Sequence, residues 1–481
     1  MATLRLSLLF QGVEIEAMPE ADPEVGGIAY RSDRVEPGDV FFCIPGFVHD
    51  GHDFAPDAVE RGASAVVVKR PLPGVDVPQV VVTDPRVALA HASAAFFGHP
   101  SSEMRVVGIT GTNGKTTSAY LVESILRAGG MRSGLLGTVE VRVGDARRPA
   151  GRTTPESLDL QRTFAEMREA GVEAVAMEVS SHAIDLHRVD AVEFAVVAFT
   201  NLSQDHLDYH KTMEEYFAVK KRLFSNRSRG SVVCIDDDAG AELAAEVGPQ
   251  LTVGLSEGAD VTARDIRMAP AHTDFVLVAG GSEARVRLPL AGAYNVSNSL
   301  LAAGCGLCLG LDLATVAAGL ESAEQVPGRL ERIECGQPFA VYVDYAHTPA
   351  GLEKAIAAVR EVTEGRLITV FGCGGDRDPE KRPMMGRAAA NGSDVVVVTS
   401  DNPRSEDPVG IILQIEDGIR EVRGDHIVEV DRRAAIERAI GMAGPGDAVL
   451  IAGKGHEDYQ IFADRTIHFD DREVAREVLG C

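Results

Sequence analysis

The sequence predicts an α/β protein of three domains: a smaller N-terminal α/β domain, a central parallel-sheet domain and a C-terminal Rossmann-like domain. Three observations lead to this prediction. The length of 481 residues corresponds to about three domains of roughly 150 residues each. Short apolar runs alternate with helical patterns throughout the chain, which is typical of parallel strands joined by crossover helices. One of these runs leads into a glycine-rich loop that ends in Lys-Thr.

The composition indicates a globular protein with hydrophobic cores, because 45% of the residues are apolar and 25% are charged. The formal net charge of −25 repels phosphate backbones, so we expect no nucleic-acid partner. An anionic substrate must then be held by local Arg and Lys side chains. No apolar run approaches the ~20 residues that a membrane-spanning helix needs.

The N-terminus and the cysteines indicate a cytoplasmic protein. The first segment soon reaches Glu14 and Glu16 and has no small-residue cleavage site, so it does not resemble a signal peptide. The seven cysteines are odd in number and scattered, which argues against a disulfide framework and for a reducing compartment. Cys305 and Cys308 form a lone CxxC inside an apolar helical stretch, and we interpret them as core thiols.

The N-terminal domain is expected at residues 1–103. It has a helical pattern at 86–97, a linker at 98–104 and three strand-like runs, VFFCI (40–44), SAVVV (64–68) and QVVVT (79–83). The central domain is expected at 104–330 and ends near VPGRLE, where Pro and Gly interrupt a helical stretch. Its strand candidates are RVVGIT (105–110), EAVAMEV (173–179), FAVVAFT (194–200) and SVVCI (231–235).

The C-terminal domain, residues 331–481, has the most regular pattern. Four strand runs are separated by amphipathic helices: AVYV (340–343), RLITVF (366–371), DVVVVT (394–399) and AVLIA (448–452). Each run ends in a polar or glycine-rich turn, in the order DYAHTP, GCGGDRD, SDNPRSEDP and AGKGHEDYQ. Ligands bind outside the carboxyl ends of parallel strands, so the four turns predict one site. Solvated loops without function would explain a single turn of this kind better than all four.

The segment GITGTNGKTT (108–117) predicts a phosphate loop between a strand and a helix. Its glycines let backbone N–H groups face phosphate oxygens, Lys115 can neutralise the β and γ phosphates, and the Thr116 hydroxyl can reach Mg²⁺. The strict pattern requires glycine at position 109, where this chain has Ile109. The loop predicts binding of a nucleoside triphosphate but does not name a reaction.

Two further polar clusters end strands of the central domain. Glu178 ends EAVAMEV, and the segment TNLSQDHLDYH supplies Asp205, His206, Asp208 and His210. His206 and His210 have the spacing of a zinc protease, but that motif requires Glu where Leu207 stands. Carboxylate and imidazole beside a phosphate loop are more typical of Mg²⁺, which shares its ligands with substrate phosphates. For any one of these histidines, a packing role is the alternative.

Taken together, these segments resemble the Mur ligase family, ATP-dependent enzymes that add amino acids to the cell-wall precursor. The resemblance is greatest to the type that adds the third residue, and it covers essentially the whole chain. It is carried by an ordered series: RSDRVEPGDVFF, GITGTNGKTT, RTTPESLDLQ, MEVSSHAIDLHRV, FTNLSQDHLDYH, YFAVKKRLF, GAYNVSN, PGRLE, VDYAHTP, FGCGGDRD, DNPRSEDP and AGKGHEDYQ. The resemblance implies a central P-loop ATPase domain.

The resemblance also implies roles for individual residues. Catalysis would depend on Lys115, Glu178, His206 and Lys220. Thr116 and Glu178 would hold one Mg²⁺, His206 would help to hold a second, and Lys220 would be carbamylated (N6-carboxylysine) and bridge to that second ion. ATP would be bound by Gly111, Thr112, Asn113, Gly114, Lys115, Thr116, Thr117, Asn295, Arg329 and Asp344.

The two remaining sets concern the acceptor and the amino acid. The UDP end of the acceptor would contact Tyr30 and Ser32, and its sugar-peptide end Thr153, Thr154, Ser180 and Arg188. Two positions depart from other members: GFVHDG (46–51) replaces a polar uridine contact, and Leu186 replaces a glutamine. Diaminopimelate would be bound by Arg377, Asp401, Asn402, Pro403, Arg404, Gly453 and Glu457.

The implied reaction is ligation of meso-2,6-diaminopimelate to UDP-N-acetylmuramoyl-L-alanyl-D-glutamate through an acyl phosphate, giving ADP and phosphate. The DNPR segment favours diaminopimelate, since Arg404 can grip its second carboxylate in a bidentate manner. Alternatively, Arg404 only neutralises Glu406 and Asp407. L-Lysine as the amino acid, a folylpolyglutamate synthetase and a nucleotide-dependent switch are the competing functions. The resemblance implies small-molecule partners, with neither nucleic acid nor a membrane span, and we expect a monomer.

Overall fold

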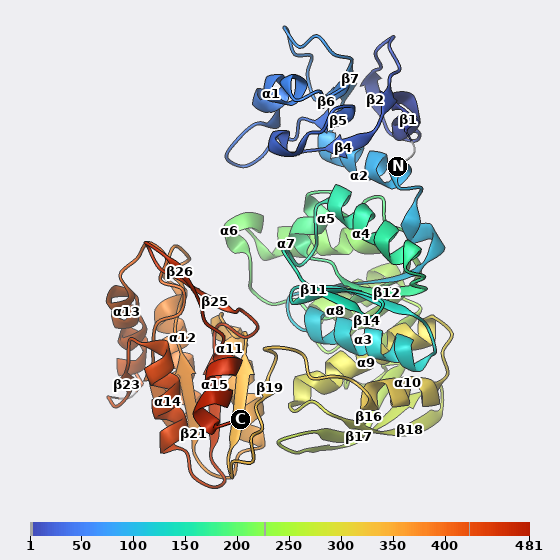
Figure 1. The fold of residues 1–481 in the computed structure, drawn as a ribbon. Helices are drawn as coiled ribbons and strands as arrows, with labels where there is room; N and C mark the ends of the chain where they lie inside the picture. Colours follow the sequence, from blue (N-terminus) through green and yellow to red (C-terminus); the bar gives the residue numbers. More distant parts are fainter. Residues whose placement is uncertain (1–2, 226–227, 423) are drawn as a thin grey trace. The chain divides into compact units, whose positions relative to one another are not determined.

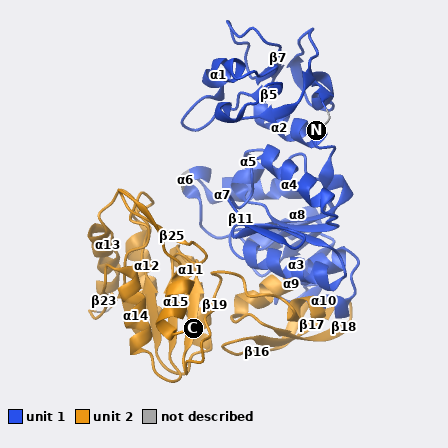
Figure 2. Cartoon of the chain, in the orientation of Figure 1, with its two compact units in different colours: residues 1–261, 301–316 blue, residues 262–300, 317–481 orange. Residues whose placement is uncertain are grey.

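The computed structural model describes residues 3–225, 228–422 and 424–481 of the chain. The chain forms two compact units, which Figure 2 shows in different colours. Unit 1 comprises residues 1–261 and 301–316, and unit 2 comprises residues 262–300 and 317–481. Both units contain parallel strands joined by helices (Figure 1), so the predicted α/β class is confirmed. The boundaries of the three expected domains stay predictions.

The first sheet of unit 1 has the strand order β2-β7-β6-β5-β4, with β2 antiparallel and the other strands parallel. It confirms the three predicted strand runs and the helix that follows them. The predicted linker contains a 3-10 turn, Pro100–Glu103, whose Ser101 is buried. The elements are β2 (Ile15–Ala17), β4 (Gly27–Ala29), β5 (Asp39–Phe42), α1 (Ala55–Glu60), β6 (Ala65–Val68), β7 (Gln79–Val82) and α2 (Pro85–Phe96).

The second sheet of unit 1 runs in the order β11-β10-β9-β12-β8-β13-β14-β15. β8 (Arg105–Thr110) lies between β12 (Ala174–Glu178) and β13 (Phe194–Phe199), and both neighbours run parallel to it. The carboxyl ends of these strands therefore meet at one edge. The other elements are α3 (Lys115–Ala128), β9 (Ser133–Leu136), β10 (Glu140–Val143), β11 (Ala146–Pro149), α4 (Ser157–Glu169), α5 (Ser181–Asp185), α6 (Leu207–His210), α7 (Met213–Lys221), β14 (Ser228–Cys234), α8 (Asp238–Val247) and β15 (Leu251–Val253).

The segment after β15 contains strands that the apolar runs do not reveal. β16 (Val261–Met268) is followed by an antiparallel hairpin of β17 (Thr273–Ala279) and β18 (Ser282–Leu288). Two helices come next, α9 (Ala293–Cys308) and α10 (Leu313–Glu321). Cys305 in α9 is fully buried, and burial raises its pKa and that of Cys308, which fits their interpretation as core thiols.

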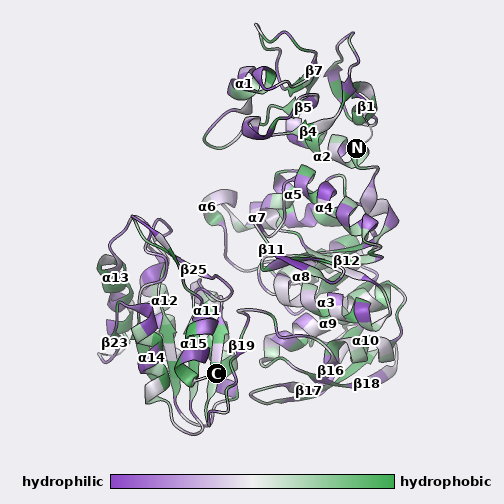
Figure 3. Ribbon diagram, viewed as in Figure 1, coloured by the Kyte–Doolittle hydropathy of each residue, from purple (hydrophilic) through white to green (hydrophobic). Residues whose placement is uncertain are grey.

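The sheet of unit 2 has the order β19-β20-β24-β21-β22-β23, in which only β19 is antiparallel. Helices cover both faces: α11, α12 and α13 pack on one, and α14 and α15 on the other. The strands are mainly hydrophobic in Figure 3, because both faces are buried. The elements are β19 (Glu331–Arg332), β20 (Ala340–Asp344), α11 (Pro349–Glu361), β21 (Leu367–Phe371), α12 (Lys381–Gly392), β22 (Val395–Val398), α13 (Pro408–Arg420), β23 (Ile427–Val428), α14 (Arg432–Met442), β24 (Ala448–Ala452), β25 (Tyr459–Ile461), β26 (Thr466–His468) and α15 (Asp471–Leu479).

One cysteine pair corrects the expectation of a chain without disulfides. Cys335 and Cys481, 146 residues apart, form a disulfide with a Cα–Cα distance of 5.6 Å. Cys335 packs in the same hydrophobic cluster as Val474 and Leu479 of α15, and this packing brings the C-terminus to it. The spacing of the cysteines in the sequence does not predict that Cys335 and Cys481 lie close together. The other five cysteines are free.

None of the helices in the described part of the chain has both the length and the apolar character needed to cross a membrane.

Candidate active site

The phosphate loop leaves β8 and enters α3, as predicted. Gly111 has φ of 143°, and a Cβ atom there would lie 1.8 Å from the Thr200 Oγ1, so only glycine fits. Gly114, with φ of 85°, is the N-cap residue of α3. Ile109 is fully buried inside β8. Ile109, which replaces the glycine of the strict phosphate-loop pattern, therefore belongs to the buried strand and not to the loop that follows it.

The segment after β13 forms hydrogen bonds with the phosphate loop. The sequence did not predict this contact. The Asn113 N–H donates to the Asn201 Oδ1 (3.0 Å), and the Asn201 Nδ2 donates back to the Asn113 carbonyl (3.0 Å). The Asn113 Nδ2 also donates to the Ser203 hydroxyl (3.0 Å). Asn201 and Ser203 belong to the segment TNLSQDH. This segment directly follows a predicted strand, and that position could have indicated a contact with the loop after β8.

Two lysines meet at the loop. The Lys115 Nζ donates to the carbonyl oxygens of Gly111 (3.0 Å) and Thr112 (2.7 Å). The Lys220 Nζ donates to the same Gly111 oxygen (2.8 Å) and lies 4.4 Å from the centre of the Tyr216 ring. Burial, together with the charge of Lys115, holds the pKa of Lys220 well below its ordinary value. The structure thus places a buried amine directly against the phosphate loop.

Glu178 ends β12 beside the loop and is 1% exposed. Its Oε2 accepts hydrogen bonds from the hydroxyls of Thr116 (2.9 Å) and Thr138 (3.1 Å). Its Oε1 accepts from the Thr138 N–H (2.7 Å). Hydroxyl and carboxylate oxygens are the ligands that Mg²⁺ prefers, so Thr116 and Glu178 fit the predicted metal role. Thr138 is a partner that the sequence did not reveal.

His206 lies near Lys220 through a shared neighbour. Its ring centre is 6.2 Å from that of Tyr216, the ring that Lys220 contacts, and 5.0 Å from that of His182. His206 precedes α6 with φ of 54°, and its side chain is 45% exposed. His210 contacts the same two rings, with its ring centre 5.6 Å from that of His182 and 5.0 Å from that of Tyr216, and its Nε2 lies 2.9 Å from the Ser181 hydroxyl. The two histidines therefore share ring neighbours and differ in burial, since His210 is only 4% exposed.

Four residues predicted to contact the sugar-peptide end lie together beside Glu178. The Thr154 hydroxyl donates to the Glu178 carbonyl (2.9 Å) and accepts from the Ser180 N–H (3.1 Å). The Arg188 guanidinium donates to the Thr154 carbonyl (3.1 Å). The Thr153 hydroxyl lies 3.0 Å from that of Thr138, the partner of Glu178.

The residues predicted for the UDP end lie directly after β4, the edge strand of the first sheet. The Tyr30 hydroxyl donates to Asp159 (2.7 Å), and Ser32 begins a short 3-10 helix. Tyr30 lines a cavity of about 390 Å³ whose other walls include Arg31, Arg34, Asp159 and Arg162. The segment 46–51 is the one that differs from the uridine contact of other family members. Its Phe47 is 76% exposed and contacts the Tyr209 ring edge-on, with 5.8 Å between the ring centres.

The predicted nucleotide residues of unit 2 centre on Asp344 at the end of β20. Its carboxylate accepts from the N–H groups of Leu330 (2.7 Å) and Ala346 (2.8 Å), and burial raises its pKa although Arg329 opposes the shift. The Arg329 guanidinium lies 4.7 Å above the Tyr345 ring. Asn295 is 2% exposed and donates to the Ala291 carbonyl (2.7 Å). Residues 111–117 belong to unit 1 and these residues to unit 2.

In unit 2 the loops after β21, β22 and β24 lie against one another. The Gly375 N–H donates to the Asn402 carbonyl (2.9 Å), and the Arg404 guanidinium donates to the Gly375 carbonyl (2.8 Å). A Cβ atom at Gly453 would lie 2.7 Å from the Asp401 carboxylate. The sheet thus gathers the predicted diaminopimelate residues, with Arg377 exposed at the rim.

The alternative role for Arg404 finds no support. Glu406 accepts two hydrogen bonds from Arg382 (both 2.9 Å), and Asp407 caps α13 through the N–H groups of Val409 and Gly410. Both carboxylates therefore have other partners. Arg404 itself has φ of 53° and is partly buried, a conformation that costs a non-glycine residue free energy.

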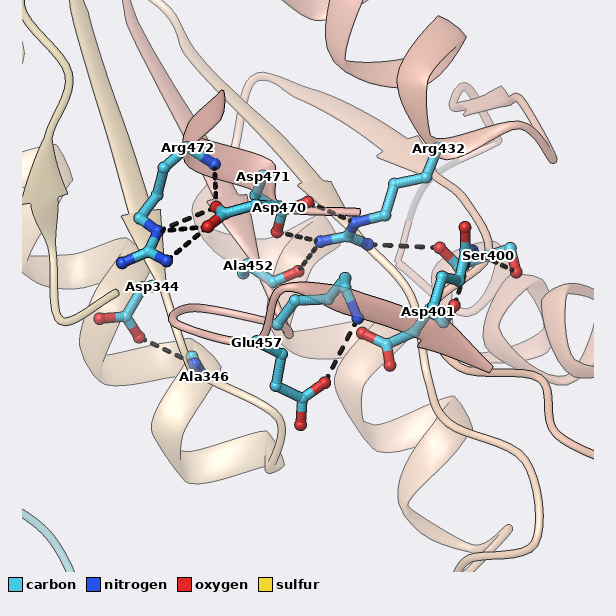
Figure 4. A network of polar contacts seen from close by, with 12 residues as sticks. Asp344, Ala346, Ser400, Asp401, Arg432, Ala452, Glu457, Asp470, Asp471 and Arg472 are labelled. Carbon is cyan, nitrogen blue, oxygen red and sulfur yellow. Dashed lines mark hydrogen bonds and ion pairs between the residues drawn. The ribbon is translucent and has the colours of Figure 1, made fainter. Parts of the chain in front are cut away.

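A buried ion pair supports two of these loops (Figure 4). Arg432 and Asp471 are both fully buried, and two guanidinium nitrogens of Arg432 contact the Asp471 carboxylate at 2.7 Å. The same guanidinium donates to the carbonyl oxygens of Ser400 (3.3 Å) and Ala452 (3.0 Å). Ala452 is the last residue of β24, and Ser400 lies two residues after the end of β22, at the start of its loop. Sequence analysis offered no signal for this pair.

A phosphate loop beside a buried hydroxyl–carboxylate pair, together with polar loops at the edge of a second parallel sheet, defines a nucleotide-dependent α/β enzyme. Three family models match the chain: "Mur ligase family, catalytic domain" at residues 24–97, "Mur ligase middle domain" at 109–306 and "Mur ligase, glutamate ligase domain" at 328–455. The chain belongs to the Mur ligase family.

Relatives agree with this assignment. The UDP-N-acetylmuramoyl-L-alanyl-D-glutamate–2,6-diaminopimelate ligase of Geobacillus kaustophilus is 48% identical over 464 residues, 95% of each chain. A solved structure of a ligase with the same name is 31% identical, covers 99% of both chains and has a TM-score of 0.72. A folylpolyglutamate synthase of Mycobacterium tuberculosis is 19% identical, covers 82% of this chain and 95% of its own, has a TM-score of 0.64 and shares the fold.

Proposed function

We propose that the protein is an ATP-dependent ligase that joins meso-2,6-diaminopimelate to UDP-N-acetylmuramoyl-L-alanyl-D-glutamate in peptidoglycan synthesis. The single observation that carries this function is the 48% identity over 95% of the chain to a ligase named for these substrates. The sites agree with it, since the predicted ATP, metal, acceptor and amino-acid residues occur as local groups within the two units.

The reaction needs positioning and charge neutralisation more than covalent help from the protein. The acceptor carboxylate attacks the γ-phosphorus of ATP and displaces ADP, which gives an acyl phosphate. The amine of the amino acid then attacks the acyl carbon, phosphate leaves and the nitrogen loses a proton. Lys115 would neutralise transferring phosphate oxygens, and Thr154 and Arg188 would hold the acceptor near Glu178.

We propose Mg²⁺ as the cofactor, held by Thr116 and Glu178, with His206 and carbamylated Lys220 at a second position. When bound, the ion would offset the negative charge of the phosphates. The hard oxygen donors of Thr116 and Glu178 support the first position. The buried Lys220 amine beside the phosphate loop supports the second, because carbon dioxide reacts with a neutral amine. We further propose that the enzyme acts as a cytoplasmic monomer.

Arg404 is proposed to select the amino acid. Meso-diaminopimelate carries a second carboxylate that L-lysine lacks, and a guanidinium can bind it through two parallel hydrogen bonds. Arg404 is partly buried at the junction of two loops, and neither Glu406 nor Asp407 is its hydrogen-bond partner. A lysine substrate would leave this cation without its anion.

Phosphate release with UDP-N-acetylmuramoyl-L-alanyl-D-glutamate, measured with meso-diaminopimelate and with L-lysine, tests the function. We expect turnover only when acceptor and diaminopimelate are both present, and Arg404→Ala should lower kcat/KM for diaminopimelate roughly 100-fold or more while KM for ATP stays unchanged. The exposed Arg420 of α13, as Arg420→Ala, is the matched control. A preference for L-lysine would overturn the amino-acid assignment. ATP hydrolysis that requires neither substrate would indicate a switch protein.

A further inference from the structure

Lys454 is a buried cation in the middle of the proposed diaminopimelate residues, and the proposed function gives it no role. It follows β24 and has a fully buried side chain. Its ammonium donates to three acceptors: the Asn402 Oδ1 (3.3 Å), the Glu457 Oε2 (3.3 Å) and the carbonyl of Tyr459. A lysine is rarely buried unless its charge is paired and its hydrogen bonds are made. Here all three donors find oxygen.

The backbone brings these partners together. The Glu457 N–H donates to the Lys454 carbonyl (3.0 Å), which closes a turn and puts both side chains on one side. The strand β25 then returns alongside the loop after β22, where the Ile461 N–H donates to the Asn402 Oδ1 (3.0 Å). Lys454 therefore lies where three separate segments converge.

The contacts fix the orientation of two side chains. The Asn402 Oδ1 accepts from Lys454 and Ile461, so its Nδ2 must face the Glu457 Oε2, to which it donates at 2.8 Å. Both Lys454 and Asn402 thus bind the same Glu457 oxygen. No described residue donates a hydrogen bond to the Glu457 Oε1, and Figure 4 draws no contact to it. The Glu457 side chain is 16% exposed. The Oε2 of Glu457 is therefore bound by protein groups, and its Oε1 is available to a ligand.

We propose that Lys454 is a positioning residue for amino-acid recognition: it orients Asn402 and Glu457 so that Glu457 presents one oxygen to the ammonium group of the incoming amino acid. This inference rests on the proposed function, which assigns Glu457 to the amino acid. Asn402 is 2% exposed, its Oδ1 accepts from Lys454 and Ile461 and its Nδ2 donates to Glu457, so Lys454 fixes the orientation of this side chain as well as that of Glu457.

The test compares steady-state constants of Lys454→Met with those of the wild type. Removing the ammonium should raise KM for meso-diaminopimelate roughly 10- to 100-fold, the size expected from losing hydrogen bonds to a charged group. KM for ATP and for the UDP-linked acceptor should stay within about 2-fold. Lys454→Gln, which keeps two N–H donors, should recover part of the loss and also serves if Lys454→Met does not fold. The exposed Lys354 of α11, as Lys354→Met, is the matched control.

A double-mutant cycle identifies the route of the effect. If Lys454 acts through Glu457, Lys454→Met should add little to the KM increase of Glu457→Gln. Three results would overturn the positioning role. The first is full additivity of the two substitutions, and the second is an unchanged KM for the amino acid. The third is a parallel change in all three KM values together with a lower Tm. Failure of the proposed function can be distinguished from failure of the positioning role, because in the first case the wild type itself does not ligate diaminopimelate. In that case the same comparison is made with the amino acid that the wild type uses.

Discussion

Lys115 and Lys220 donate to the same carbonyl oxygen, that of Gly111, at 3.0 and 2.8 Å. Two ammonium groups so close repel each other, and the more buried one loses its proton more easily. Lys220 is 1% exposed, whereas Lys115 is only half-buried. Burial therefore lowers the pKa of Lys220, which favours the neutral amine that the proposed carbamylation requires.

Lys115→Ala should leave the fold intact and nearly abolish turnover. Contacts from a fixed cation to transferring phosphates are commonly worth factors of ~10² to 10³ in rate. Phosphate release by the variant, with its circular dichroism spectrum compared with that of the wild type, measures the effect. Activity close to wild type in a folded variant would exclude the proposed role of the loop.

Lys220→Ala should lose most activity and regain part of it with short carboxylates such as acetate, which can supply the missing oxygen ligands. Labelling with ¹³C-enriched carbon dioxide should give a carbamate signal that the variant lacks. Lys221 is the natural control, because its ammonium pairs with Glu246 (2.7 Å) on the outside of α7, and Lys221→Ala should be nearly silent. An unmodified Lys220 in the active enzyme equilibrated with carbon dioxide would contradict the carbamate.

At the scale of the elements, the strand order of unit 2 explains why a buried ion pair is present. β22 and β24 are separated by β21, so no sheet hydrogen bond links the two loops that follow them. Arg432, the first residue of α14, spans this gap by donating to the carbonyls of Ser400 and Ala452. Asp471, the first residue of α15, balances its charge. The two helices thus fix the spacing of two loops that the sheet alone leaves unlinked.

Arg432→Met should lower the free energy of unfolding by about 3–5 kcal/mol, because Asp471 is left as a buried, unpaired charge. Denaturant unfolding followed by circular dichroism measures the change. Arg433→Met is the matched control: Arg433 joins the same two helices through Glu477, but both side chains are exposed, so the loss should stay below about 1 kcal/mol. Equal losses in the two variants would refute the importance of burial.

The pair can also be tested by removing both charges. Arg432→Met combined with Asp471→Leu should restore much of the stability lost in Arg432→Met, since no uncompensated charge remains. The KM for diaminopimelate should be raised both in Arg432→Met and in this double variant, because in each the carbonyls of Ser400 and Ala452 have lost their shared donor. Recovery of both stability and KM would mean that the pair does not set the spacing of the loops.

At the scale of the whole molecule, stability should fall on mild acidification. Burial, with help from Arg329, Arg472 and His347, lowers the pKa of His456 from its ordinary 6.5 to about 4, although Asp470 opposes the shift. The native state keeps this ring neutral between these values, whereas the unfolded chain takes up a proton. Stability is therefore lost as the pH falls from about 6.5 towards 4.

His456→Gln should reduce that loss. Unfolding free energies of wild type and variant, measured at pH 7.5 and at pH 5, give the comparison, and the wild type should lose more of its stability between them. Gln cannot take up a proton in this range, so the difference reports on position 456 alone. Parallel pH dependences of the two proteins would show that His456 titrates normally in the folded state.

Much of this molecule could be predicted from local sequence. The strands β8, β22 and β24, the glycine-rich loop at 108–117 and the polar turns after each C-terminal strand were predicted and are present. They are encoded by neighbouring residues, since a strand buried on both faces needs a continuous apolar run and a loop around phosphate needs glycine at fixed spacing. The family followed from the order of such segments.

Tertiary structure alone decided which distant residues meet. Thr138 with Glu178, Asn201 with Asn113, Arg432 with Asp471, Lys454 with Asn402 and Cys335 with Cys481 are partners separated by 40, 88, 39, 52 and 146 residues. Nothing in the residues around Lys454 distinguishes a buried cation from an exposed one. Its burial results from the return of β25 onto the loop after β22, and packing between segments far apart in the chain leaves no local pattern.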